Sequence, residues 1–135
     1  MAGKRTLLLV AAAVVAVAAG GGCGFQPQAA GFTAAVSSSE ALGNSMAAAY
    51  GWGPGQQGCL DALWTRESGW RADAVNPTSG ATGIPQLNPH FYAIPPGWAD
   101  PRVQIRWGLR YLRNTPYGTH DPCGAWAHEQ NKGWY

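Results

Sequence analysis

The chain contains few charged residues and no pattern that would bind a metal ion. Charged residues make up 12% of its 135 positions, and it has only three cysteines and three histidines. The cysteines form no CxxC pair and the histidines are not regularly spaced, so the ligand arrangement of a zinc site is missing. We therefore expect neither a metal nor another cofactor.

An excess of positive charge is also missing from most of the chain. The nine Lys and Arg residues outnumber the seven acidic residues only because Lys4 and Arg5 lie at the start. From Gly31 onward the two signs balance, so nothing predicts a surface for nucleic acid. Four later arginines recur at helical spacing and predict one solvated helix face. They are Arg102, Arg106, Arg110 and Arg113.

Residues 1–23 have the pattern of an export signal. Two basic residues precede the apolar run Leu7–Ala19, which small residues follow. A spanning helix needs roughly 20 apolar residues, so this shorter run predicts a secretory signal, with a retained anchor as the alternative. Cleavage after residues 16–18 fits the small-x-small rule, whereas GGGC ending at Cys23 resembles a lipobox whose cysteine would carry a lipid. We expect an exported protein, extracellular or associated with the cell wall. Its membrane contact would be limited to the signal or a lipid anchor.

The remaining cysteines indicate a disulfide. Residues 24–37 are small and nearly uncharged, and we interpret them as a linker before a single domain of residues 38–135. Cys59 and Cys123 both lie in that domain, and two distant cysteines in a small exported domain most simply pair. Closing this loop would stabilise the fold by about 4 kcal/mol.

Helical patterns predict a mainly α domain. Serines before Glu40 mark the start of a first helix, and a second is expected at about 56–67. Asp-Pro pairs at 100–101 and 121–122 predict two more helices, ending near Arg113 and His128. Residues 68–96, rich in Gly, Pro, Asn and Ser, lack helical periodicity, which is typical of a functional segment in a compact domain.

Glu67 lies on an otherwise apolar stripe of the second predicted helix. Leu60, Leu63, Trp64 and Glu67 are spaced i, i+3, i+4 and i+7, which puts them on one helix face, while Arg66 points elsewhere. Burial disfavours an ionised carboxyl, so its pKa should rise. A glycosidase needs such a protonated acid to protonate the leaving sugar oxygen. The alternative is a helix-end glutamate held by hydrogen bonds.

An ordered set of motifs carries a family resemblance. Glu67-Ser68 ends the helix, NPTSGA follows at 76–81, and GIPQ follows at 83–86. This order resembles that of actinobacterial proteins with a transglycosylase SLT-like domain, relatives of the soluble lytic transglycosylases and goose-type lysozymes. The stretches QIRWGLRYL at 104–112 and AWAHEQNKGWY at 125–135 are similar to the same subgroup, so the resemblance covers residues 40–135.

The resemblance implies a small lysozyme-like domain that acts on peptidoglycan strands as a monomer. Glu67 would protonate the glycosidic oxygen between N-acetylmuramic acid and N-acetylglucosamine. It would then accept the proton of the muramoyl 6-hydroxyl, giving a 1,6-anhydro product. A second carboxylate is not evident, because Asp73 and Asp100 are the only candidates and neither lies in a motif. The alternatives are lysozyme-type hydrolysis, a glycan-binding module, and a structural cell-wall protein.

The same resemblance suggests residues that contact the substrate. Ser68, Gly83, Ile84 and Gln86 would line the cleft, with Gln86 touching sugar. The family's Tyr-Asn pair is missing from residues 125–128, where His128 either replaces that polar partner or faces solvent.

The seven tryptophans add a choice between packing and binding. Trp64, Trp107 and Trp126 fall on helical stripes and are expected in the core. Trp70, Trp98 and Trp134 lie in irregular segments, where each either fills the core or stacks on a sugar ring. Of these we assign Trp70 to the substrate-binding set.

Overall fold

The computed structural model describes residues 37–135. The predicted signal, nearly all of the predicted linker and the lipidation of Cys23 therefore lie outside the described residues. The described part contains four helices and no strand, apart from isolated bridges of Thr82 with Val75 and Leu87. The prediction of a small, mainly helical domain is confirmed. None of these helices is both long and apolar enough to span a bilayer.

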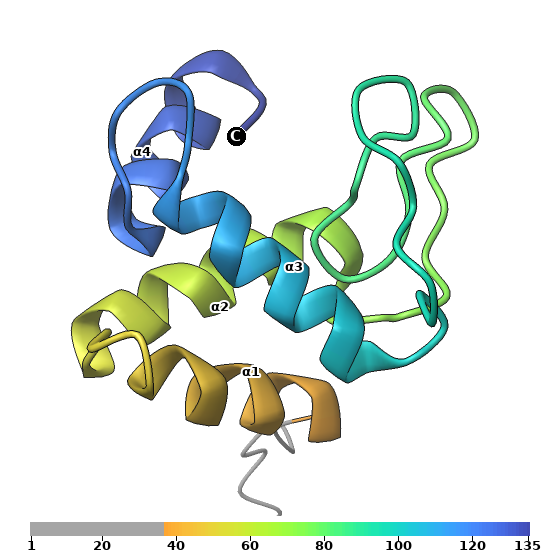
Figure 1. Cartoon of the computed structure of the whole chain (residues 1–135). Helices are drawn as coiled ribbons and strands as arrows, with labels where there is room; N and C mark the ends of the chain where they lie inside the picture. The colour runs from red at the N-terminus through yellow and green to blue at the C-terminus, as the bar shows by residue number, and fades with distance from the viewer. Residues whose placement is uncertain (1–36) are drawn as a thin grey trace, which may run out of the picture. The chain divides into compact units, whose positions relative to one another are not determined.

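Side chains cap the N-termini of three helices, and the second helix begins at Pro54, two residues before its predicted start. The four helices are α1 (Ser38–Ala48), α2 (Pro54–Ser68), α3 (Pro101–Arg113) and α4 (Pro122–Lys132) (Figure 1). Asp100 and Asp121 cap α3 and α4 by accepting hydrogen bonds of 2.8 Å from backbone N–H groups. The prediction that the last helix ends near His128 is wrong, because α4 continues until Gly133, whose φ of +77° forms its left-handed C-cap.

The apolar core lies where α1 packs on α2 and α3, and where α2 packs on α4. Trp64 of α2 is its largest fully buried side chain. The Trp64 ring packs closely against α3 because Gly108 has no side chain. A Cβ on Gly108 would lie 2.5 Å from this ring. All four arginines on α3 are exposed, as predicted.

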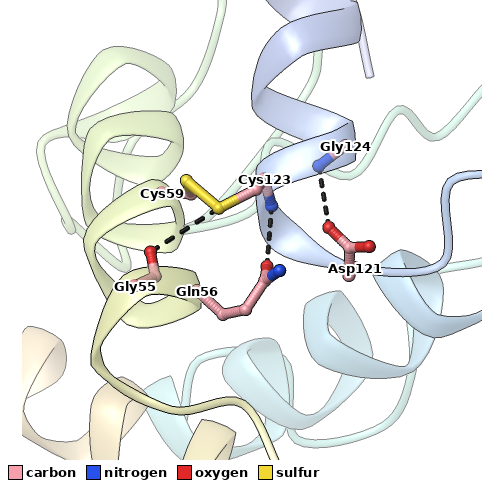
Figure 2. Close-up of a disulfide and its surroundings, with 6 residues drawn as sticks. All are labelled: Gly55, Gln56, Cys59, Asp121, Cys123 and Gly124. Atoms are coloured by element: carbon pink, nitrogen blue, oxygen red, sulfur yellow. Dashed lines mark hydrogen bonds between the residues drawn. A yellow bond between two sulfur atoms is a disulfide. The ribbon is translucent and has the colours of Figure 1, made fainter.

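A disulfide joins α2 to α4, and the predicted pairing of Cys59 with Cys123 is confirmed (Figure 2). The two Cα atoms are 4.9 Å apart and 64 residues separate them in the chain. The backbone N–H of Cys123 also donates to Gln56 Oε1 at 2.9 Å, so the first turn of each helix is held to the other.

The irregular segment, residues 69–100, is held against α3 by one buried amide. Gln104 is fully buried, and its Oε1 accepts a hydrogen bond of 2.8 Å from the backbone N–H of Ile84. Its Nε2 donates to the carbonyl oxygens of Ala72 at 3.0 Å and Trp98 at 2.6 Å. In the view of Figure 1 this segment is at the upper right and α4 at the upper left, with the C-terminal residue between them. One side chain thus anchors three points of a segment that contains no helix.

Candidate functional site

A pocket of about 600 Å³ is lined by two kinds of residues. Those from α2, α4 and the C-terminal segment include both acidic side chains of the pocket, and we call this set the carboxylate wall. It consists of Glu67, Glu129, Trp134 and Tyr135. The set from the irregular segment and α3 carries amides, a hydroxyl and aromatic rings, and we call it the aromatic–amide wall. Its polar and aromatic members are Asn76, Ser79, Gln86, Asn88, Phe91, Tyr92, Trp107 and Tyr111, and Ala81, Pro85 and Leu87 also belong to it.

Glu67 lies in the last turn of α2, where Gly69 ends the helix in a left-handed conformation. Its side chain is partly buried, and no hydrogen bond or ion pair among the described residues involves its carboxyl. Burial, and then the negative charge of Glu129, raise the pKa of Glu67 from 4.5 to about 7, while Arg66 lowers it. Glu67 therefore stays protonated at a higher pH than an ordinary glutamate does. The alternative of a glutamate held by hydrogen bonds does not fit this geometry.

Glu129, which the sequence reasoning missed, is the second carboxylate of the pocket. It is 4% exposed and lies on the buried face of α4 with Pro122 and Ala125. Its Oε1 is 2.9 Å from Nε of Arg66. Pro122, Ala125 and Glu129 recur at helical spacing, and this pattern could have predicted that Glu129 is buried. The predicted helix ended at His128, however, and so did not include Glu129. Asp73 and Asp100, the two candidates considered, do not line the pocket.

Tyr135 connects the two walls. Its hydroxyl accepts a hydrogen bond of 3.1 Å from Nε1 of Trp64 and donates one of 2.6 Å to the carbonyl oxygen of Pro85. The hydroxyl of Tyr111 donates to the backbone carbonyl of Tyr135 at 3.1 Å. Burial and then the charge of Glu67 raise the pKa of Tyr135 well above its usual value. A tyrosine thus lies close to the acid without the Tyr-Asn pair, although it does not hydrogen-bond to Glu67.

Of the predicted substrate contacts, Gln86 lines the pocket together with Glu67. Its backbone has a φ of +50°, and its Nε2 donates to the carbonyl oxygen of Gly83 at 2.9 Å. Gly83 and Ile84, the other two residues of this segment predicted to contact substrate, do not line this pocket. The Ile84 side chain is fully buried, and a Cβ on Gly83 would lie 2.6 Å from Oε1 of Gln104. Both residues shape the segment that carries Gln86.

Ser68 and Trp70 are buried in the fold, which contradicts their assignment to substrate. Ser68 is 6% exposed, and its hydroxyl donates to the carbonyl oxygen of Ile84 at 2.8 Å. Trp70 is 4% exposed, and its Nε1 donates to Asp61 at 2.9 Å. Its ring also packs edge-on against Trp64, so no indole face is free for a sugar. The tight turn at Gly69 returns Trp70 to the core because the adjoining surface is apolar.

His128 is only partly buried, and none of the described hydrogen bonds joins it to Glu67. Its ring stacks on Tyr117 with centroids 4.0 Å apart, and its Nδ1 is 2.8 Å from the carbonyl oxygen of Trp134. It does not line the pocket. His128 instead holds the backbone of Trp134, which does line the pocket and is 53% exposed.

Aromatic rings form a continuous part of the aromatic–amide wall. Trp107 and Tyr111, one turn apart on α3, are stacked with centroids 5.4 Å apart, and Tyr92 packs edge-on against both. Trp107 is partly exposed, so its expected place in the core is corrected to the pocket. Phe91, at the rim, is 77% exposed. Partly exposed rings of this kind offer apolar faces to a ligand.

Residues 37–135 contain no group of three or more His, Cys, Asp or Glu residues that could hold a metal ion. Comparisons of the chain with family models, with curated proteins and with solved structures found no match. Function therefore has to be inferred from the residues that line the pocket.

Proposed function

We propose that this protein is a peptidoglycan lytic transglycosylase with a small lysozyme-like domain, and that Glu67 is its catalytic acid and then its base. One observation carries this proposal. A partly buried carboxyl with a pKa of about 7 and no hydrogen-bond partner lines a pocket that also carries amides and aromatic rings. The order of the motifs around Glu67 and Gln86 supports the choice of substrate.

The reaction needs one carboxyl in two protonation states. Protonated Glu67 donates its proton to the glycosidic oxygen, and the bond from that oxygen to C1 of N-acetylmuramic acid breaks. The resulting carboxylate then accepts the proton of the muramoyl 6-hydroxyl while O6 bonds to C1. The product is a 1,6-anhydro end, no water is consumed, and Glu67 is protonated again. A pKa close to neutral suits both steps.

The aromatic–amide wall suits a sugar polymer better than a flat apolar ligand. Oδ1 of Asn76 and of Asn88 and Nε2 of Gln86 are already hydrogen-bonded to the backbone. The Nδ2 groups of Asn76 and Asn88 can still donate to a sugar, and Oε1 of Gln86 can still accept from one. The stacked rings of Trp107 and Tyr111 supply an apolar surface next to them. This mixture of rings and a few polar groups is what orients a ligand in a pocket.

Hydrolysis of the lysozyme type is the second candidate, and Glu129 is the observation that favours it. Two carboxyl groups line the same pocket, as they do in glycosidases that use an acid together with a second carboxylate. In that reaction water, and not the 6-hydroxyl, would attack C1 and leave a reducing end.

Digestion of peptidoglycan by the exported protein tests the proposal, with mass spectrometry of the released muropeptides. We expect 1,6-anhydro products from the wild type and a loss of about 10²- to 10⁴-fold in rate for Glu67→Gln. Asp73→Asn, which removes an exposed carboxyl outside the pocket, should keep full activity. Reducing ends would show hydrolysis, and binding of strands without any product would show a binding module.

The stability of Glu67→Gln indicates whether the variant keeps its fold. The pKa of Glu67 is about 7 in the folded protein against an ordinary 4.5, so the folded state loses stability as pH rises from 4.5 through 7. Glutamine cannot ionise. The variant should therefore be more stable than the wild type at about pH 8, and the advantage should vanish below about pH 4.

A further inference from the structure

Arg66 and Glu129 form an ion pair, and their side chains differ strongly in solvent exposure. The Arg66 side chain is 56% exposed, whereas that of Glu129 is 5% exposed. Oε1 of Glu129 contacts the guanidinium, but its Oε2 is buried and has no hydrogen-bond partner among the described residues. A buried carboxylate oxygen without a partner is costly, so its presence in a pocket wall calls for an explanation.

We propose that Glu129, paired with Arg66, is a positioning residue that keeps Glu67 in its protonated form. Glu67 and Glu129 line the same pocket, and its described lining contains no third acidic residue. The unpartnered oxygen leaves part of the Glu129 charge uncompensated inside the protein. A second negative charge on Glu67 is then disfavoured, as it is wherever two carboxylates share a poorly solvated site. This inference rests on the proposed role of Glu67 as an acid.

Arg66 forms an ion pair with Glu129 and not with Glu67, so the two carboxyls have different electrostatic environments. Arg66 and Glu67 are adjacent in sequence, yet the guanidinium contacts Glu129 on α4 at 2.9 Å. A guanidinium paired with Glu67 would favour its ionised form and remove the proton that the acid must donate. Pairing Arg66 with Glu129 instead leaves the Glu67 carboxyl without an ion-pair partner, so the two carboxyls lie in different environments.

The neighbouring titratable groups whose pKa is shifted are tyrosines, and burial raises the pKa of each. Tyr135 from the C-terminal segment is close enough to Glu67 for each to affect the other, and burial raises its pKa. Burial also raises the pKa of Tyr111 on α3 above its ordinary value, and that of Tyr117 near Glu129 to about 12. Beyond Tyr117 lies His128 of α4, which stacks on it. Arg66 and Glu129 are thus the charges to which Glu67 responds.

Direct titration of the Glu67 carboxyl tests the proposal without relying on turnover. Carbon-detected NMR of the protein, with Glu67 assigned by comparison with Glu67→Gln, measures the midpoint of the Glu67 titration. In Glu129→Gln we expect the midpoint to fall by about one pH unit, and the alkaline limb of kcat/KM to move with it. Activity above the limb would drop about tenfold and activity at about pH 5 would stay the same. Glu129→Asp should restore the wild-type midpoint in part.

Arg66→Gln gives a change of opposite sign, which a merely structural effect would not produce. Removing the cation leaves the Glu129 charge uncompensated, so the Glu67 midpoint should rise and the alkaline limb should move to higher pH. Asp73→Asn, which removes an exposed charge, should leave the midpoint unchanged.

The outcomes separate this inference from the proposed function. An unchanged or raised Glu67 midpoint in folded Glu129→Gln would overturn the inference, as would a lowered midpoint that leaves the alkaline limb in place. If Glu129→Gln does not fold, the Glu67 midpoints of Glu129→Asp and Arg66→Gln test the inference instead. A shift of both midpoints in the same direction would overturn it. A wild type that cleaves no peptidoglycan at any pH would refute the proposed function while the titration still measures the coupling.

Discussion

The two walls of the pocket are built and held in different ways. The two acids of the carboxylate wall lie on two regular helices, α2 and α4, and a disulfide joins these helices. The aromatic–amide wall comes mostly from the irregular segment, whose position depends on hydrogen bonds from Gln104. An acid needs a rigid, water-poor environment for its pKa to rise, whereas a sugar surface needs varied groups at varied angles. Helices suit the first demand, and a segment without regular backbone bonds suits the second.

The interactions that hold the two walls also differ in how they contribute to the free energy of unfolding. A cross-link acts through the entropy of the unfolded chain and holds the helices whatever the pH. Hydrogen bonds to a buried amide act in the folded state, and breaking them leaves several backbone groups unpaired at once. Three substitutions, taken from the largest expected effect on stability to the smallest, separate these contributions.

Removing the cross-link should have the largest effect. Replacing Cys59 and Cys123 together by serine removes a bridge across 64 residues and should lower the free energy of unfolding by about 4 kcal/mol. Denaturant unfolding without a reducing agent measures the change, and reduced wild-type protein is the matched control. A double variant as stable as the oxidised wild type would contradict the assigned role of the bridge.

Removing the amide anchor should come next and should act on the other wall. Gln104→Ala leaves the N–H of Ile84 and the carbonyls of Ala72 and Trp98 without their partner, at a cost of about 3 kcal/mol. Limited proteolysis should cut the irregular segment before the helices. Gln130→Ala, at an exposed position on α4, should change neither stability nor cleavage, and equal behaviour of the two variants would refute the anchor.

Removing the hydroxyl that connects the walls should have the smallest effect. Tyr135→Phe keeps the ring but leaves Trp64 Nε1 and the Pro85 carbonyl unpaired, which should cost about 1 to 2 kcal/mol. Thermal unfolding measures it, and Tyr50→Phe, whose hydroxyl makes none of the described hydrogen bonds, is the control. Equal melting temperatures for both variants would mean that this bridge does not hold the walls together.

Local signals in the sequence predicted the helices and the position of Glu67 on its helix well. Asp100 and Asp121 cap helices where their Asp-Pro pairs indicate, because a cap is satisfied by backbone groups within a few residues. The stripe of α2 placed Glu67 beside the core because helical periodicity alone sets which side chains share a face. The disulfide was predictable for a similar reason, since only two cysteines lie in the domain.

Contacts between distant segments could not be predicted in this way. Trp70 and Trp107 exchanged their expected places, because an indole beside glycines and an indole on a helical stripe differ only in what packs against them. Tyr135 reaches Trp64 over 71 residues, and no local pattern specifies such a contact. Glu129 became a pocket residue because α4 packs on α2, which turns its buried face toward Glu67.

By itself, the sequence determined four helix starts, an irregular segment, one disulfide pairing and a glutamate on an apolar face. These features depend on interactions within a few residues or on the small number of candidates. Only the tertiary structure decided which aromatic rings line the pocket, which carboxyl accompanies Glu67, and which carboxyl Arg66 contacts. The physical reason is that burial and charge coupling depend on distances between segments, and packing alone sets those distances.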